Sequence, residues 1–248
     1  MDHGQHCAAL EMEIEQFALT LDTAPLDAAV PTCPGWTVEG LASHLGTIHR
    51  WAEHLVRTLA PRYQSSRDMD LDLGPVNAGW IRSGGAALLE TLRGARPDAP
   101  MWAWGTDQHA RFWSRRQLHE TLVHRADLEL ASGRPPVASP DVAGDAIDEL
   151  LVNLKAAQVF SPNVAELRGD GQVLAITATD VPANWSIRLT PAGFDVKQEG
   201  GTGDARLSGP ALELLLVLYR RRALAASSLL VEGDGDLADF WLAHSALQ

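Results

Sequence analysis

The spacing of hydrophobic residues changes near residues 132–141, and this change constrains the fold more than any other feature of the sequence. Before it, apolar residues such as Leu10, Ile14 and Phe17 recur at steps of three and four, which is the spacing of an amphipathic helix. After it come short segments of alternating character, which is the spacing of a half-buried strand. We therefore expect two domains, a helical one over residues 1–134 and an α+β one over residues 141–248.

The first domain is expected to be a four-helix bundle. Thr37 is a good N-cap, Glu39 places a negative charge in a first turn, and Gly133 is positioned as a C-cap. Four helices joined by long connections are typical of a bundle. The helical stretches cover residues 4–22, 37–59, 75–92 and 114–131.

The second domain is expected to combine helices with an antiparallel sheet, because its alternating segments are separated by the turn signals "GDG", "VPAN" and "TPAG". The predicted strands are residues 172–179, 184–190, 193–200, 204–209 and the stretch "SLLVEG". The predicted helices are residues 142–160, 210–222 and 236–246.

Composition narrows the class of protein. The formal net charge is −12, so bulk electrostatics do not attract nucleic acid or an anionic membrane. The longest apolar run, "ALELLLVLY", is too short to span a bilayer. Two cysteines make no disulfide framework and fit a reducing compartment. We expect a cytoplasmic protein, either a monomer or a weak homodimer, with no nucleic-acid or membrane partner.

The candidate functional residues include an acid and a histidine one helical turn apart, Glu120 and His124 in "RRQLHETLVHRADLEL". Positions i and i+4 share one face of a helix, here at the margin of its apolar side. His44 lies within the apolar stripe of the second helix, where an imidazole needs partners. The residues of this stripe are Leu41, Leu45, Ile48, Ala52 and Leu55. If the two helices meet, two imidazoles and a carboxylate form the three-ligand set of a catalytic zinc with an open fourth position. Asp127 would be a fourth ligand or would orient His124.

Simpler interpretations of these residues also exist. A Glu and a His at i and i+4 commonly form a solvated pair, and a core histidine is commonly hydrogen-bonded to backbone or to a hydroxyl. Cys33 is interpreted as a packed or loop thiol rather than a nucleophile, and Trp36 is expected to pack, or else to line the mouth of the site. We expect surface or pocket-margin positions for His49, His54 and His119, and assign no role to His3, His6, His109 and His244.

The same residues carry a family resemblance. The stretch "VPTCPGWTVEGLASHLGTIHRWA", followed later by "RRQLHETLVHRADLE", resembles the N-terminal domain of the mycothiol-dependent maleylpyruvate isomerase family, which has the DinB-like four-helix bundle. The stretches "ARLSGPALELLLVLYRRRA" and "LLVEGDGDLADFWLA" are similar to the small α+β C-terminal domain of that family. The resemblance covers nearly the whole chain.

The resemblance implies a divalent metal, zinc above all, bound by His44, Glu120 and His124. It also implies mycothiol as the thiol cosubstrate. The thiolate adds to a small electrophilic or anionic substrate, giving cis–trans isomerisation or S-transfer. Arg221 is the best match to an arginine of the C-terminal domain that holds the anionic substrate, among Arg220, Arg221 and Arg222. Arg220 stands where the family commonly has glycine.

Two other functions share these features. The chain could be a non-catalytic protein of the same fold that binds a metal or a ligand. It could also be a metal-dependent hydrolase, in which water replaces the thiol as nucleophile. A structural zinc normally has four protein ligands, and only three are evident here, which favours an open site.

Overall fold

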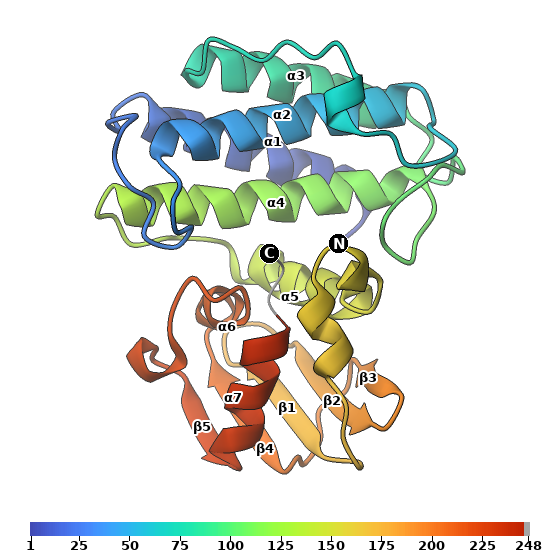
Figure 1. Cartoon of the computed structure of the whole chain (residues 1–248), viewed down its shortest axis with the longest axis vertical. Helices are drawn as coiled ribbons and strands as arrows, with labels where there is room; N and C mark the ends of the chain where they lie inside the picture. Colours follow the sequence, from blue (N-terminus) through green and yellow to red (C-terminus); the bar gives the residue numbers. More distant parts are fainter. Residues whose placement is uncertain (246–248) are drawn as a thin grey trace. The chain divides into compact units, whose positions relative to one another are not determined.

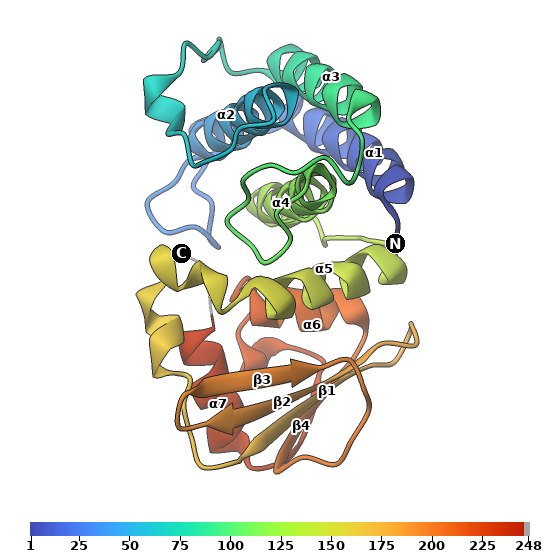
Figure 2. The same ribbon diagram turned by 90° about the vertical axis from the view of Figure 1, so that its right-hand side faces the viewer.

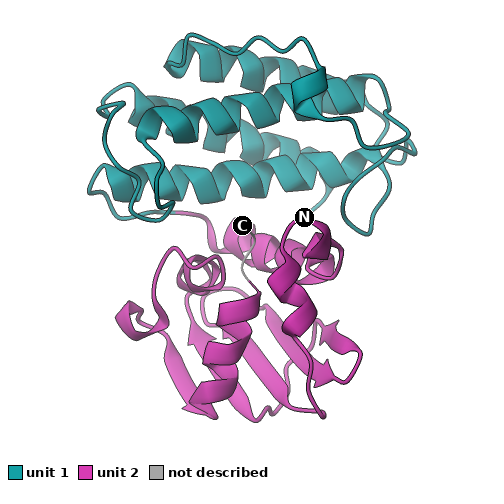
Figure 3. Ribbon diagram, viewed as in Figure 1, with its two compact units in different colours: residues 1–137 teal, residues 138–248 magenta. Residues whose placement is uncertain are grey.

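The computed structural model describes residues 1–245 and divides the chain into two compact units. Unit 1 covers residues 1–137 and unit 2 begins at residue 138 (Figure 3). This division falls inside the 132–141 segment, where the hydrophobic spacing changes. None of the helices described up to residue 245 combines the length and the apolar character that a membrane crossing requires.

Unit 1 is a four-helix bundle, as the sequence predicts. Helix α1 packs against α3 and α4, and α2 packs against the same two helices (Figure 1). A short 3₁₀ helix, η1 (Ser66–Asp68), lies in the connection between α2 and α3. The four helices are α1 (His3–Leu21), α2 (Val38–Arg57), α3 (Ala78–Gly94) and α4 (Ala110–Ala131).

Side-chain caps explain where three of these helices begin. Asp2 and Gln5 form a capping box at the start of α1. The Thr37 hydroxyl accepts a hydrogen bond from the Gly40 amide at the start of α2, which confirms the predicted cap. Asn77 caps α3 in the same way through the Trp80 amide. Each cap satisfies an amide that has no partner within its own helix.

A glycine sets the approach of α2 to α3. A Cβ atom on Gly46 would lie 2.0 Å from the ring of Trp80, so no larger residue fits between the helices there. On the same side, the guanidinium carbon of Arg50 lies 4.1 Å from the centre of the Trp80 ring. The α2–α3 contact is therefore an aromatic ring pressed against bare backbone.

Helix α4 is buried along most of its length, polar residues included. Arg125 is an example: its side chain is 3% exposed and it pairs with Glu13 at 2.5 Å and with Glu129 at 2.6 Å. Buried charges are tolerated only when they are paired in this manner. The sequence places the start of this helix at residue 114, whereas it begins at Ala110.

Unit 2 contains a five-stranded sheet with the order β3-β2-β1-β4-β5. The strands pair antiparallel except β1 and β4, which run parallel with Leu174 opposite Ala205. The prediction of an antiparallel sheet is therefore corrected to a mixed one. After β3 the chain crosses back, and β4 pairs with the edge of β1 that β2 does not occupy. The strands are β1 (Val173–Ala178), β2 (Asn184–Thr190), β3 (Gly193–Lys197), β4 (Ala205–Gly209) and β5 (Leu230–Gly233).

Three helices complete unit 2: α5 packs against α6, and both α6 and α7 contact β4 (Figure 2). The helix predicted over 142–160 is shorter than expected. It ends at Asn153, and the chain continues in 3₁₀ turns. The final residue of the helix predicted over 236–246 lies outside the described residues. The elements are α5 (Pro140–Asn153), η2 (Ala156–Val159), η3 (Pro162–Glu166), α6 (Ala211–Leu218), η4 (Leu224–Ala226) and α7 (Gly235–His244).

Candidate metal centre

Three side chains from α2 and α4 converge within unit 1. The Nε2 atom of His44 lies 3.2 Å from Oε1 of Glu120, and Nε2 of His124 lies 3.1 Å from the same oxygen. One ligand atom from each of the three residues lies within 4.8 Å of the others. The two imidazole rings meet edge to face, with their centres 5.0 Å apart. The structure therefore brings together all three residues that the sequence singles out.

Helix geometry accounts for this arrangement. Glu120 and His124 are one turn apart on α4, so their side chains share a face. His44 comes from α2, which packs against α4. The side chain of His44 is 34% exposed, that of Glu120 23% and that of His124 10%. The cluster thus lies at the rim of the bundle, open on the side of His44 and closed behind His124.

A carboxylate fixes the far side of the His124 ring. Nδ1 of His124 donates to Oδ2 of Asp127 at 3.0 Å. The Thr32 hydroxyl donates to Oδ1 of Asp127 at 2.6 Å, and the Cys33 thiol lies 3.5 Å from Oδ2. This network holds Nε2 of His124 toward Glu120. This contact corresponds to the second of the two roles that the sequence left open, in which Asp127 orients His124 rather than binding a metal.

Arg116 holds the other oxygen of the glutamate. Its Nη2 atom donates to Oε2 of Glu120 at 2.8 Å, and its side chain is only 5% exposed. The sequence interpretation missed this residue. Four-residue spacing would have found it, because Arg116, Glu120 and His124 follow one another at that interval on α4.

The electrostatics of the cluster favour charged side chains. Burial opposes the charge on Glu120, but hydrogen bonds from His124 and His44 and the charge of Arg116 hold the pKa of its carboxyl well below the usual range. Burial also opposes the charge on His124. Hydrogen bonds to Asp127 and Glu120 outweigh it and raise the pKa of His124 to about 9. Without a metal, His124 is therefore a cation at neutral pH.

Trp36 borders the cluster. The centre of its ring lies 5.0 Å from that of His44 and 6.3 Å from that of His124, and Trp36 is 36% exposed. Of the two roles considered for this residue, the structure supports a place at the mouth of the site. The tight turn at Gly35, with a φ of 85°, brings the ring there.

The donor set fits a divalent transition metal. Two imidazole nitrogens and one carboxylate oxygen are the ligands of many catalytic zinc sites, and Asp127 supplies the outer hydrogen bond that such histidines normally make. Cys33, His124 and Asp127 form a second group with metal-binding atoms within 4.8 Å. That group uses the same His124 ring, and its carboxylate already accepts from Nδ1.

Two predictions about other histidines are wrong. His49 and His119, expected near the surface, are both fully buried. His49 bonds through Nε2 to the Thr121 hydroxyl at 2.9 Å, and burial lowers its pKa to about 3. The expected stripe on α2 gave Ile48 a core position, but Ile48 is only half-buried and His49 takes the core. His54 lines a pocket, as anticipated.

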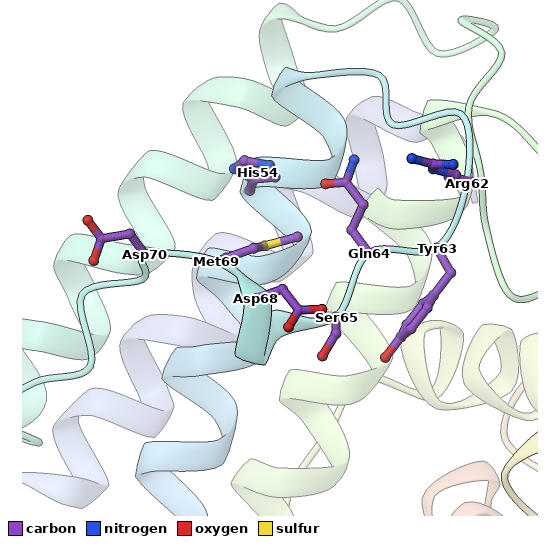
Figure 4. A pocket seen from close by; sticks show the side chains of 8 residues that line it. All are labelled: His54, Arg62, Tyr63, Gln64, Ser65, Asp68, Met69 and Asp70. Carbon is purple, nitrogen blue, oxygen red and sulfur yellow. The ribbon is translucent and has the colours of Figure 1, made fainter.

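That pocket does not include the cluster. It is a hollow of ≈ 810 Å³ beside the α2–α3 connection, lined by residues such as Tyr63, Gln64 and Met69 (Figure 4). His54, which also lines it, is ten residues from His44 and so about 15 Å farther along the helix axis. The polar cluster is the stronger candidate site, because its charged groups converge.

The arginine triplet of unit 2 follows α6. Arg220 has a φ of 57°, the left-handed conformation in which glycine is common after a helix. Arg220 therefore adopts a backbone conformation that glycine reaches more easily than other residues. Arg221 donates from Nη1 to the Tyr219 carbonyl at 2.9 Å, and Arg222 pairs with Glu213.

Fold and site together define a two-domain protein whose helical bundle carries a His–Glu–His cluster suited to a metal. Residues 7–129 match the mycothiol maleylpyruvate isomerase N-terminal domain, and residues 141–240 match the MDMPI C-terminal domain. The chain belongs to the mycothiol-dependent maleylpyruvate isomerase family. The resemblance described from the sequence is thereby confirmed.

Solved structures share this fold. A crystal structure of the mycothiol-dependent maleylpyruvate isomerase is 15% identical, with a TM-score of 0.57 over 92% of this chain and 93% of that one. A histidine-to-alanine mutant of a mycothiol-dependent maleylpyruvate isomerase is 14% identical, with a TM-score of 0.56 over the same shares. No curated protein sequence matches significantly.

Proposed function

We propose that this protein is a metal- and mycothiol-dependent enzyme that acts on a small electrophilic or anionic substrate by cis–trans isomerisation or S-transfer. The convergence of His44, Glu120 and His124 on one point is the observation that supports it most. Family membership supports the thiol cosubstrate.

His44, Glu120 and His124 would hold the metal through Nε2, Oε1 and Nε2. When bound, a divalent metal such as zinc supplies a Lewis acid that favours the thiolate form of a thiol at neutral pH. Asp127 keeps Nε2 of His124 facing the site. Trp36 and the half-exposed His44 border its open side, where cosubstrate and substrate would approach.

Arg221 is our candidate for holding the anionic part of the substrate. Arg222 is engaged by the Glu213 carboxylate, whereas Arg221 is half-buried, donates to the Tyr219 carbonyl and lies over the Tyr219 ring. A guanidinium recognises a carboxylate through two parallel hydrogen bonds, which lysine does not reproduce. Arg221→Lys should therefore raise KM for an anionic substrate more than it lowers kcat.

Metal analysis tests the first half of the proposal. The purified protein should contain close to one divalent metal per chain, and Glu120→Ala should lose it. Arg111→Ala is a matched control, because Arg111 lies on the same helix, is exposed and contacts Asp107 and His109 rather than the cluster. Retention of metal by Glu120→Ala would remove Glu120 from the ligand set.

A thiol panel tests the second half. Mycothiol, glutathione and water are each offered with maleylpyruvate and with a generic electrophile. We expect turnover with mycothiol. Turnover in water alone would instead show a hydrolase, and a loaded protein inactive under every condition would show a non-catalytic binding protein.

A further inference from the structure

The two carboxylate oxygens of Glu120 contact different kinds of side chain. Oε1 faces both imidazoles, at 3.2 Å from His44 and 3.1 Å from His124. Oε2 accepts from Nη2 of Arg116 at 2.8 Å. A carboxylate can bind a metal through one oxygen or through both, and the difference occupies one coordination position. The group that binds Oε2 therefore determines whether that coordination position stays available to another ligand.

The surroundings of Arg116 favour a stable hydrogen bond to Oε2 of Glu120. Its side chain is 5% exposed, so its charge requires a carboxylate partner, and breaking a buried pair is strongly unfavourable. Its guanidinium also lies 5.8 Å from the centre of the Trp104 ring, which limits its freedom to turn away. The bond to Oε2 is short and charge-assisted, the strong kind of hydrogen bond.

We propose that Arg116 restricts Glu120 to a single metal-binding oxygen, Oε1, and so keeps a coordination position free for an incoming thiol. This inference rests on the proposed metal site and assigns Arg116 as a positioning residue. Its positive charge also offsets that of Glu120, so a bound cation retains more attraction for an anionic ligand than it would beside an unpaired carboxylate.

The test uses the full chain loaded with Co²⁺, whose visible absorption is intense in four-coordinate sites and weaker in five-coordinate ones. Arg116→Met removes the guanidinium and keeps much of its volume. We expect its Co²⁺ absorption to weaken as Oε2 joins the metal. Because the variant lacks a positive charge beside the metal and gains a second oxygen ligand, the apparent Kd for Co²⁺ should fall about tenfold. The apparent Kd for β-mercaptoethanol, followed by its sulfur-to-cobalt band, should rise about tenfold.

Two further variants separate positioning from mere packing. Arg116→Lys keeps a cation able to reach Oε2 and should restore the parent spectrum. Arg111→Met, an exposed arginine on the same helix, should change nothing. If Arg116→Met does not fold, Arg116→Gln is measured instead, with the same expected changes.

The outcomes are distinct. A parent protein that binds no Co²⁺ would overturn both the proposed function and this inference. A parent that binds Co²⁺, with an uncharged variant of Arg116 giving the same spectrum and the same thiol affinity, would overturn the role of Arg116 alone.

Discussion

Two pairs of histidines on the same two helices behave in opposite ways. His44 and His49 lie on α2, and His119 and His124 lie on α4, each pair five residues apart. Five residues turn a helix by about 140° beyond a full circle, so the members of each pair face different surroundings. His44 and His124 reach a glutamate at the rim, whereas His49 and His119 enter the core.

The difference shows that the groups around each histidine, rather than the residue type, determine the pKa of its ring. His124 has two carboxylates within 3.1 Å, and its pKa rises to about 9. His49 bonds to the uncharged hydroxyl of Thr121 instead, and burial lowers its pKa to about 3. The first ring is prepared for a cation, since a metal can replace its proton, and the second is a neutral part of the core.

The largest expected effect follows from removing a rim histidine. His44→Ala should lower metal affinity by more than the ~10- to 100-fold that loss of an outer partner causes, and should abolish activity. Because the side chain is partly exposed, unfolding free energy of the metal-free protein should change little. Metal analysis and chemical denaturation measure the two quantities. Full metal retention would refute the ligand role of His44.

The opposite pattern is expected for a core histidine. His49→Ala should destabilise the protein by about 2–4 kcal/mol, because it leaves a cavity and removes the bond to Thr121. Metal stoichiometry should stay near one per chain, measured on the folded fraction. Loss of metal with unchanged stability would show instead that His49 belongs to the site.

The two histidines should also give opposite pH dependence, measured by denaturation after chelator treatment. The pKa of His124 is raised above its unfolded value of about 6.5, so its contribution is full below pH 6.5 and is lost as pH rises through about 9. It amounts to about 3 kcal/mol. The pKa of His49 is lowered, so its contribution is present above pH 6.5 and is lost as pH falls toward 3.

An NMR titration of the histidine rings measures the pKa values of His124 and His49 separately. A His124 ring that titrates near pH 6.5 in the metal-free protein would contradict the role of its two carboxylates. Binding of metal at neutral pH should release about one proton per chain, because the charged ring must become neutral to bind.

The smallest effect is expected at the residue behind His124. Asp127→Asn keeps the shape of the side chain and weakens its hold on Nδ1, so metal affinity should fall about tenfold. Cys33→Ser is the matched control, because its thiol touches the same carboxylate from the outside. A loss for Cys33→Ser as large as that for Asp127→Asn would make the thiol, rather than the carboxylate, the important neighbour.

Helical periodicity predicted the bundle and the meeting of Glu120 and His124, because both depend on local spacing. Their meeting with His44 was predicted on the basis that apolar helix faces pack together. The burial of His49 was missed because the buried face of α2 was assigned to Ile48, the more hydrophobic neighbour. Only tertiary contacts reveal that the buried face of α2 includes Gly46 and His49.

The burial of polar residues on α4 could not be predicted from the sequence either. Arg125 looks like a surface residue until Glu13, more than a hundred positions earlier, is seen to pair with it. In unit 2 the alternating pattern located the strands, but alternation is the same for parallel and antiparallel neighbours. The pairing of β1 with β4 depends on the route of the chain after β3, which no local pattern encodes.

The bare backbone at Gly46 has a consequence for protein engineering. Gly46 follows His44 by two residues, and the ring of Trp80 occupies the space where any side chain would stand. Redesign of the α2–α3 interface would thus shift the backbone that carries His44, a proposed metal ligand. A library that varies residue 46 should vary residue 80 alongside it, selecting compensated pairs instead of single replacements.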